Sequence, residues 1–147
     1  MMSPLILKLA SRLHVALYRA SGGRLGGRFR KTAPVLLLTT TGRKTGKPRT
    51  TPLLYLEDAR RYVVIASVGG APKHPAWYLN LRNDANATIQ VGNRKLNVNA
   101  ATATPEERGR LWARAVEMYA GYAGYQAKTS REIPLVILTP VAGAPAR

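Results

Sequence analysis

The chain has 147 residues and a hydrophobic content of 46%, which suits one folded domain with a buried core and excludes wholesale disorder. It contains no cysteine, which excludes disulfides and thiolate metal sites. Its two histidines, His14 and His74, lie far apart without a carboxylate cluster, so no metal site is expected. The 23 Lys and Arg against 7 Asp and Glu give a formal net charge of +16, which predicts an anionic partner: nucleic acid, an acidic lipid surface or a small ligand with several negative charges.

Residues 1–31 are predicted to form an amphipathic basic helix followed by a linker. Ser3 and Pro4 are typical of the N-cap and the first residue of a helix. The segment is too short and too charged to span a bilayer, and Lys8 and Arg12 interrupt what would be the apolar core of a signal peptide. Two arrangements stay open: the helix lies on an anionic membrane surface, or it packs on its own domain with its charges solvated. Its apolar stripe consists of Leu5, Leu9, Leu13, Ala16, Leu17 and Ala20.

Residues 32–140 are predicted to form one mainly β domain. Short connections join the first three strands, which favours an antiparallel meander. Pro52 is expected at an edge or a bulge, because proline cannot donate a hydrogen bond to a neighbouring strand. Gly92 and Asn93 are typical of a two-residue hairpin turn. The predicted strands span residues 35–41, 49–56, 61–67, 87–91, 95–101 and 133–139.

Helices are expected between these strands. A short one covers residues 76–82, after a glycine-rich loop. Thr104, Pro105 and Glu107 form a capping box at the start of a longer helix, whose apolar face continues to Tyr119. The Pro/Ala/Gly-rich residues 141–147 are expected to be frayed.

This order of elements favours an α+β, mainly β fold: a small antiparallel barrel with an N-terminal helix and two or three interposed helices. A dinucleotide-binding fold is disfavoured, because no GxGxxG follows a strand and no P-loop signature is present.

Three segments are candidates for chemistry. Residues 39–49 place four cations and several hydroxyls in one β-turn, which suits a phosphate or carboxylate, although a solvated hairpin tip is the more usual explanation of such a charge run. Residues 74–81 follow a glycine loop with a helix start, another device for binding anions, and their Trp77 can stack on a flat ring or fill a core. Residues 118–126 repeat tyrosine at every third position, which suits the wall of a flat apolar pocket or ordinary core packing.

Together these segments carry a resemblance to a known family. The motifs are LTTTGRKTGKPR at 38–49, SxGG at 67–70, KHPAWYLNL at 73–81 and MYxxYxxYQ at 118–126. In this order and spacing, the chain resembles the deazaflavin (coenzyme F-420)-dependent nitroreductase and quinone reductase family over residues 34–140. The resemblance implies an FMN-binding split-barrel-like β-barrel, reduced coenzyme F-420 as the cofactor, and hydride transfer to a quinone-like acceptor such as menaquinone or to a related unsaturated or nitro compound.

The resemblance also implies roles for particular residues. The phosphate and acidic tail of the cofactor would be held by Arg43, Lys44, Thr45 and Arg49. The deazaflavin and its ribityl chain would be lined by Thr50, Thr51, Pro52, Leu53, Leu54, Ile65, Ala66, Ser67, Val68, Ala76, Trp77, Tyr78, Leu79, Asn80 and Tyr122. The acceptor pocket would consist of Leu54, Tyr119, Tyr122 and Tyr125. As hydride arrives, the hydroxyl of Tyr122 or Ser67 would stabilise negative charge on the acceptor oxygen.

Two positions depart from this resemblance. Leu54 stands where some quinone and nitroimidazole reducers of the family have tyrosine, and Val68 stands where they have lysine. The first changes the acceptor pocket and the second removes one cation, which argues against activation of nitroimidazole prodrugs. A cytoplasmic protein, monomeric or weakly dimeric, is expected, with contact to the inner membrane face as an open alternative and no nucleic acid as partner. The rival hypotheses are a non-enzymatic basic module that binds nucleic acid, and a split-barrel protein that binds FMN or haem.

Overall fold

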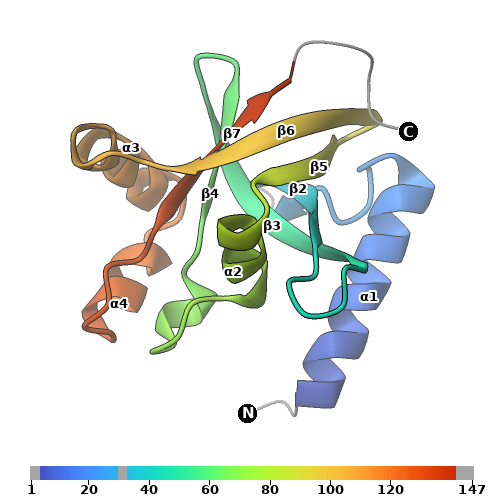
Figure 1. Ribbon diagram of the computed structural model, residues 1–147, viewed down its shortest axis with the longest axis horizontal. Coiled ribbons are helices and arrows are strands. Elements are labelled where there is room, and N and C mark those ends of the chain that lie inside the picture. Colours follow the sequence, from blue (N-terminus) through green and yellow to red (C-terminus); the bar gives the residue numbers. More distant parts are fainter. Residues whose placement is uncertain (1–3, 30–32, 142–147) are drawn as a thin grey trace.

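The computed structural model describes residues 4–29 and 33–141, which form an antiparallel β-barrel flanked by helices (Figure 1). The strands are hydrogen-bonded in the order β1-β2-β3-β4-β7-β6-β5, and a further pairing of β2 with β5 closes six of them into a barrel. Every pairing is antiparallel. The strands are β1 Arg28–Phe29, β2 Ala33–Thr41, β3 Pro48–Asp58, β4 Arg61–Ile65, β5 Asn86–Val91, β6 Arg94–Thr102 and β7 Leu135–Pro140.

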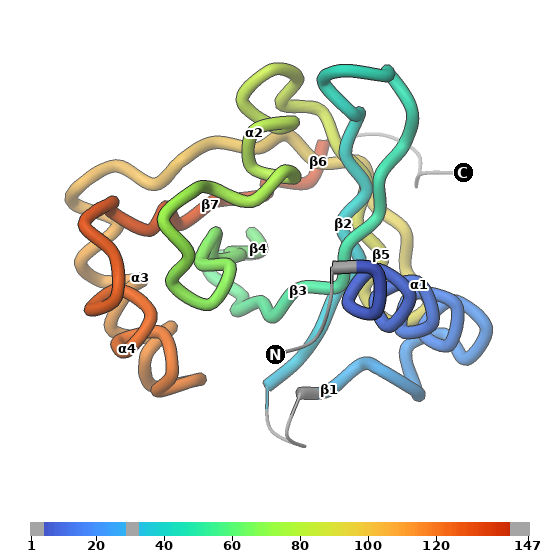
Figure 2. The backbone as a smooth tube through the Cα atoms, turned by 90° about the horizontal axis from the view of Figure 1, so that it is seen from below, coloured from blue at the N-terminus to red at the C-terminus, as the bar shows by residue number. Residues whose placement is uncertain are grey.

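Three of the helices described, α1, α3 and α4, lie on two opposite sides of this barrel. In Figures 1 and 2, α1 runs along one side of the barrel, while α3 and α4 lie together on the other. A short 3-10 helix, η1, and α2 connect β4 to β5. The helices are α1 Pro4–Ser21, η1 Val68–Gly70, α2 Ala76–Asn83, α3 Pro105–Met118 and α4 Gly121–Ala127.

The six strands predicted from the sequence are all present, and the predicted barrel class is confirmed. The hairpin between β5 and β6 turns at Gly92 and Asn93, with Val91 opposite Arg94. The N-cap half of the predicted capping box is present, since the Thr104 side chain accepts a hydrogen bond from the backbone N–H of Glu107 at 3.3 Å, while the Glu107 carboxylate pairs with Arg61 at 3.1 Å. Two short elements, β1 and η1, lack the periodicity that would reveal them in the sequence.

The predicted helix through Tyr119 ends earlier than expected. Tyr119 has an extended backbone, with φ −145° and ψ 102°, so α3 ends at Met118 and α4 begins separately at Gly121. A Cβ on Gly121 would lie 2.4 Å from the Tyr119 ring, so a larger residue there would displace that ring. Predictions about Ser3 and about residues 142–147 lie outside the described residues.

Pro52 lies at an edge, as predicted. Along β3, the half that contains Pro52 pairs only with β2, where Pro52 is opposite Leu37. The second half pairs with β4, beginning at Tyr55 opposite Val64. Since proline lacks an N–H, it fits where β3 has one neighbour. The first half of β3 therefore has a free edge, which is available to a site.

Helix α1 packs on the barrel. Val15 and Tyr18 are buried against Val35 and Leu37 of β2. The Tyr18 hydroxyl donates to the Gln90 carbonyl at 3.2 Å and accepts from the Gly92 N–H at 2.8 Å, which joins the helix to the end of the β5–β6 hairpin. Among the helices within the described residues, none is long and apolar enough to cross a membrane. Of the two arrangements left open by the sequence, the structure shows α1 packed on its own domain.

Candidate functional site

The basic turn between β2 and β3 is a tight loop. The Gly42 N–H donates to the Lys47 carbonyl at 2.8 Å, and the Gly46 N–H donates to the Gly42 carbonyl at 2.7 Å. Gly46 has φ +70°, a conformation that favours glycine. A Cβ on Gly42 would lie only 2.9 Å from the Thr45 hydroxyl oxygen. The glycines thus let the chain fold back closely enough to present Arg43 and Lys44 together.

Asn80 of α2 anchors this loop. Its side chain is 4% exposed, and its Nδ2 donates to the Thr40 hydroxyl at 3.0 Å. Its Oδ1 accepts from the Arg43 backbone N–H at 3.1 Å and from the Arg43 guanidinium at 3.4 Å. The oxygen and the nitrogen of the buried Asn80 amide therefore both have hydrogen-bond partners. Because Asn80 belongs to α2, this helix holds Arg43 in place.

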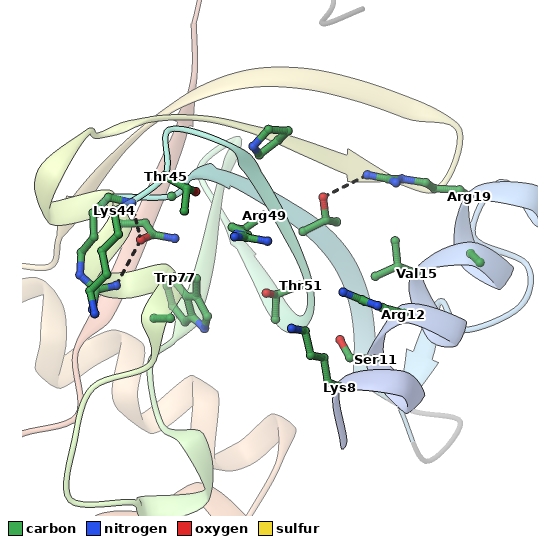
Figure 3. Close-up of a pocket in the computed structure, with 17 residues that line it drawn as sticks. Lys8, Ser11, Arg12, Val15, Arg19, Lys44, Thr45, Arg49, Thr51 and Trp77 are labelled. Carbon is green, nitrogen blue, oxygen red and sulfur yellow. Dashed lines mark hydrogen bonds between the residues drawn. The ribbon is translucent and has the colours of Figure 1, made fainter. Parts of the chain in front are cut away.

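A basic cavity of about 750 Å³ lies between the loop and α1 (Figure 3). Its walls come from the β2–β3 turn and the following residues of β3 on one side, from α1 on the other, and from the start of α2. Six basic side chains line it, and the described residues contribute no acidic side chain to its lining. Such a concentration of like charge is favourable only beside an anion. The six are Lys8, Arg12, Arg19, Arg43, Lys44 and Arg49.

An apolar cavity of about 490 Å³ adjoins the basic cavity. Thr51 and Trp77 line both, so the two cavities meet at these side chains. The free edge of β3 forms one wall, the η1 segment a second and the region around α4 a third. The remaining lining residues are His14, Val35, Pro52, Leu53, Leu54, Ile65, Ser67, Val68, Gly69, Pro75, Tyr119, Tyr122 and Tyr125.

Three tyrosines wall the apolar cavity. Tyr119 and Tyr122 pack edge to face with ring centroids 5.1 Å apart, and Tyr125 lies 6.1 Å from Tyr122. The hydroxyls of Tyr119 and Tyr125 are hydrogen-bonded at 2.8 Å. Tyr122 is 4% exposed, and burial raises the pKa of its hydroxyl well above the ordinary tyrosine value. Like any tyrosine, Tyr122 is protonated at physiological pH, and its hydroxyl can donate a hydrogen bond.

Arg131 fastens the loop that carries Ser67. Its guanidinium donates to the carbonyls of Ala66 at 3.1 Å, Ser67 at 2.7 Å and Ala71 at 2.9 Å. The same group contacts Nδ1 of His74 at 3.1 Å. Because a guanidinium can only donate, this ring nitrogen accepts and the His74 proton lies on Nε2. The Arg131 side chain thus contacts four residues of the segment 66–74, which the sequence predicts only as a loop.

Ser67 and Val68, two of the residues of that loop that line the apolar cavity, differ in exposure. Ser67 is 9% exposed, and its hydroxyl makes no capping bond to η1. Val68 is 51% exposed and has φ +44°, a strained conformation for a β-branched residue. A lysine at this position would have its ammonium at the mouth of the cavity, so Val68 leaves the mouth apolar.

Most of the residues that the family resemblance implies come together around these two cavities. Ala66, Tyr78 and Leu79 lie outside both: Ala66 is fully buried, Tyr78 bonds to Thr102 at 3.1 Å, and Leu79 lines a separate cavity with Arg43 and His74. Sequence analysis missed the contribution of α1, since no local pattern tells which element its cations face. The α1 side chains that line the cavities are Lys8, Ser11, Arg12, His14, Val15, Ala16 and Arg19.

Several known proteins are similar to this chain in sequence and fold. An F420H(2)-dependent quinone reductase of Mycobacterium tuberculosis is 45% identical over 131 residues, which are 87% of this chain and 88% of that protein. The solved structure of an F420-H2 dependent reductase, FDR-A, is 44% identical with a TM-score of 0.66 and covers 71% of this chain and 93% of its own. Another solved structure, described as a domain-swapped dimer, is 37% identical with a TM-score of 0.69 and covers 92% of this chain and 99% of its own.

These similarities extend over the barrel, both cavities and most of α1. The model of the F420H(2)-dependent quinone reductase family matches residues 10–140, from the middle of α1 to the end of β7. The resemblance suggested by the four motifs is thereby confirmed, and the chain belongs to the F420H(2)-dependent quinone reductase family.

Proposed function

We propose that this chain is a reductase that binds reduced coenzyme F-420 and transfers its hydride to a quinone-like acceptor held in the apolar cavity. The observation that carries this function is the junction of the two cavities at Thr51 and Trp77. One side of the junction is strongly basic and the other is apolar and walled by tyrosines. Relatives that match this chain over most of their length are named F420H(2)-dependent quinone reductases.

The residues present fit the cofactor. Coenzyme F-420 combines a flat deazaflavin with a phosphate and a tail of carboxylates, so it needs an apolar slot joined to a cationic groove. Arg43, Lys44 and Arg49 line the basic cavity, and we expect them to bind the phosphate and tail through charge-assisted hydrogen bonds. Trp77, which is 7% exposed, is placed at the junction to contact the ring. When bound in its reduced form, the cofactor supplies a hydride.

The tyrosine wall would act on the acceptor. Negative charge develops on a quinone oxygen as hydride arrives, and a donor placed beforehand stabilises it. Tyr122 and Ser67 both line the apolar cavity and both carry a hydroxyl. We assign the donor to Tyr122 in the first place, because a phenolic hydroxyl is a stronger hydrogen-bond donor than the aliphatic hydroxyl of serine. Leu54 makes the same cavity more apolar than a tyrosine would, which favours a hydrophobic acceptor.

The test begins with a titration of the protein with coenzyme F-420, followed through quenching of tryptophan fluorescence. Reduced coenzyme and menadione are then added, and the return of the oxidised coenzyme's visible absorption band is recorded. Binding followed by acceptor-dependent oxidation is the expected result. A Trp77→Phe variant should lose most of the quenching while Trp112 remains as a reference. If the protein neither binds nor oxidises the coenzyme, the proposed function is wrong.

We also propose that the outer face of α1 contacts an anionic membrane. Leu5, Leu9 and Leu13 are 66%, 53% and 60% exposed and follow one another at helical spacing. Together with the net charge of +16, this apolar stripe suits the interface of an acidic bilayer, where a hydrophobic quinone would also be available.

Vesicle flotation tests this contact. The protein should float with phosphatidylglycerol vesicles and not with phosphatidylcholine vesicles, and Leu9→Gln/Leu13→Gln should abolish flotation. A dimer that dissociates in this double variant, seen by sedimentation, would instead assign the stripe to a second copy of the chain. A monomer or weak dimer is expected for the wild-type protein.

A further inference from the structure

His14 is the residue through which α1 contributes to the lining of the apolar cavity. Its side chain is partly buried, and the other titratable side chains of this lining are Tyr119, Tyr122 and Tyr125. The described residues contribute no Lys, Arg, Asp or Glu to the same lining. Imidazole is the side chain that exchanges a proton most readily near neutral pH. The acceptor cavity therefore holds, on its α1 side, a proton-exchanging group that hydride transfer alone does not use.

One ring nitrogen of His14 is fixed by the chain that follows α1. Nε2 lies 2.7 Å from the carbonyl oxygen of Gly26. Because a carbonyl oxygen only accepts, Nε2 carries a hydrogen and donates it. Gly26 has φ +77°, and a Cβ there would lie 2.6 Å from Cδ2 of His14, so glycine allows this close approach.

The second ring nitrogen is available for a proton. Among the residues that the structure describes, Nδ1 of His14 has no hydrogen-bond partner. A protonated imidazole donates from both nitrogens, whereas the neutral ring found here donates from Nε2 alone. His14 can therefore gain and lose a proton on Nδ1 while the hydrogen bond from Nε2 to Gly26 keeps the ring in place.

A quinone acceptor needs a proton as well as a hydride. Uptake of a hydride adds two electrons and one hydrogen and leaves a hydroquinone monoanion, so one proton must still reach the charged oxygen. The tyrosine wall is a poor source of this proton. Burial raises the pKa of Tyr122, and the hydroxyls of Tyr119 and Tyr125 are hydrogen-bonded to each other. Tyr122 can stabilise the charge by a hydrogen bond, but the proton has to come from another group.

We propose that His14 is the general acid of this reaction and delivers the proton from Nδ1 to the acceptor oxygen. The inference rests on the proposed function and adds a catalytic residue to it. In this step the Nδ1–H bond of the imidazolium breaks, an O–H bond of the hydroquinone forms, and His14 becomes neutral. Both electrons arrive with the hydride that the reduced coenzyme supplies, and the partly buried ring regains its proton from the solvent.

The charged groups around His14 suit this direction of transfer. Arg12, two residues away on α1, lines the basic cavity, and Arg24 and Arg28 flank Gly26 at exposed positions. From β2, β3, η1 and α2 the lining of the apolar cavity receives only uncharged residues. Within the described lining, a hydroquinone monoanion would thus be the sole negative charge beside the imidazolium, which favours their contact and transfer of the proton.

The first test measures the oxidation of reduced coenzyme F-420 by menadione as a function of pH in the wild-type protein and in His14→Gln. Glutamine can still donate to the Gly26 carbonyl but cannot carry a proton. Because groups of the coenzyme can titrate as well, the ratio of the two pre-steady-state rates is compared. This ratio should be about a hundredfold near about pH 6 and fall to about threefold or less near about pH 8.5, where imidazole is neutral. The dissociation constant of the coenzyme should stay within about twofold.

The second test detects contact with the acceptor in the absence of the coenzyme. The imidazole NMR signals of the two histidines are followed while the wild-type protein is titrated with menadione. His74→Gln assigns the signals, since it removes one of the two sets. The signals of His14 should shift, whereas those of His74, which lies outside the lining of the apolar cavity, should not. This measurement remains decisive if His14→Gln does not fold.

His74→Gln is also the matched control for the rates, because it removes the other histidine and should keep the pH dependence of the wild type. A ratio of wild-type to His14→Gln rates that is the same at every pH would overturn the inference. Unshifted His14 signals at saturating menadione would overturn it too. If the wild-type protein fails to oxidise the coenzyme with menadione at any pH, the proposed function itself is contradicted.

Discussion

The guanidinium of Arg131 donates a hydrogen bond to Nδ1 of His74 over 3.1 Å, and the two residues are 57 positions apart in the chain. The His74 ring also packs on Tyr78 with centroids 4.9 Å apart. This pair joins the segment after α4 to the loop before α2. The hydrogen bond from Arg131 can persist only while Nδ1 of His74 is unprotonated.

Stability should therefore fall as the pH drops below about 6.5, the ordinary histidine pKa. Burial, then the charges of Arg131 and Arg82, lower the pKa of His74 in the folded protein. Between the lowered folded value and 6.5 the unfolded chain binds more protons, so the free energy of unfolding rises with pH there. Melting temperatures should show this slope between about pH 5 and 7. His74→Asn should flatten it, and an unchanged slope would rule His74 out as its source.

Tyr18→Phe should destabilise the protein by about 1–2 kcal/mol, because the Gly92 N–H loses its acceptor in a partly buried place. Urea unfolding measures this change. Tyr62→Phe removes the hydroxyl of another buried tyrosine and serves as the matched control, for which a smaller loss is expected. Equal losses of stability in the two variants would show that the hydrogen bonds of the Tyr18 hydroxyl to Gln90 and Gly92 make no specific contribution.

Asn80→Ala should raise the dissociation constant of coenzyme F-420 by roughly threefold to tenfold, the equivalent of one lost hydrogen bond. The substitution frees the Arg43 backbone and guanidinium, so the basic loop loses its anchor on α2. Turnover at saturating cofactor should change little. Asn97→Ala, on β6 and outside both cavities, should leave binding unchanged. Unaltered binding in Asn80→Ala would show that the loop holds its shape without α2.

Tyr122→Phe should lower turnover about a hundredfold while the cofactor's dissociation constant stays within about threefold of wild type, as expected for removal of one donor to a developing oxyanion. Tyr119→Phe is the control, because the Tyr119 hydroxyl is already hydrogen-bonded to Tyr125. Pre-steady-state oxidation of the reduced coenzyme with menadione measures the step directly. Equal rates for wild type and Tyr122→Phe would transfer the donor role to Ser67.

The elements of this protein follow from local pattern. Alternation of apolar residues, the Gly92-Asn93 turn and the N-cap at Thr104 each act within a few residues, so the strands and most helices could be predicted from the sequence. The basic turn at residues 42–48 and the repeated tyrosines were visible in the same way. Because their spacing matches a known family, the sequence by itself also determined the cofactor class.

What only the tertiary structure decided is which faces meet. The sequence predicted an apolar stripe on α1 but left open whether it faces lipid or the barrel. The structure buries Val15 and Tyr18 instead and turns the cations toward the cavity. Arg131 likewise gains its role from carbonyls some sixty positions away. The orientation of such a helix depends on its packing against residues that are distant in the sequence. A local sequence pattern does not contain that information.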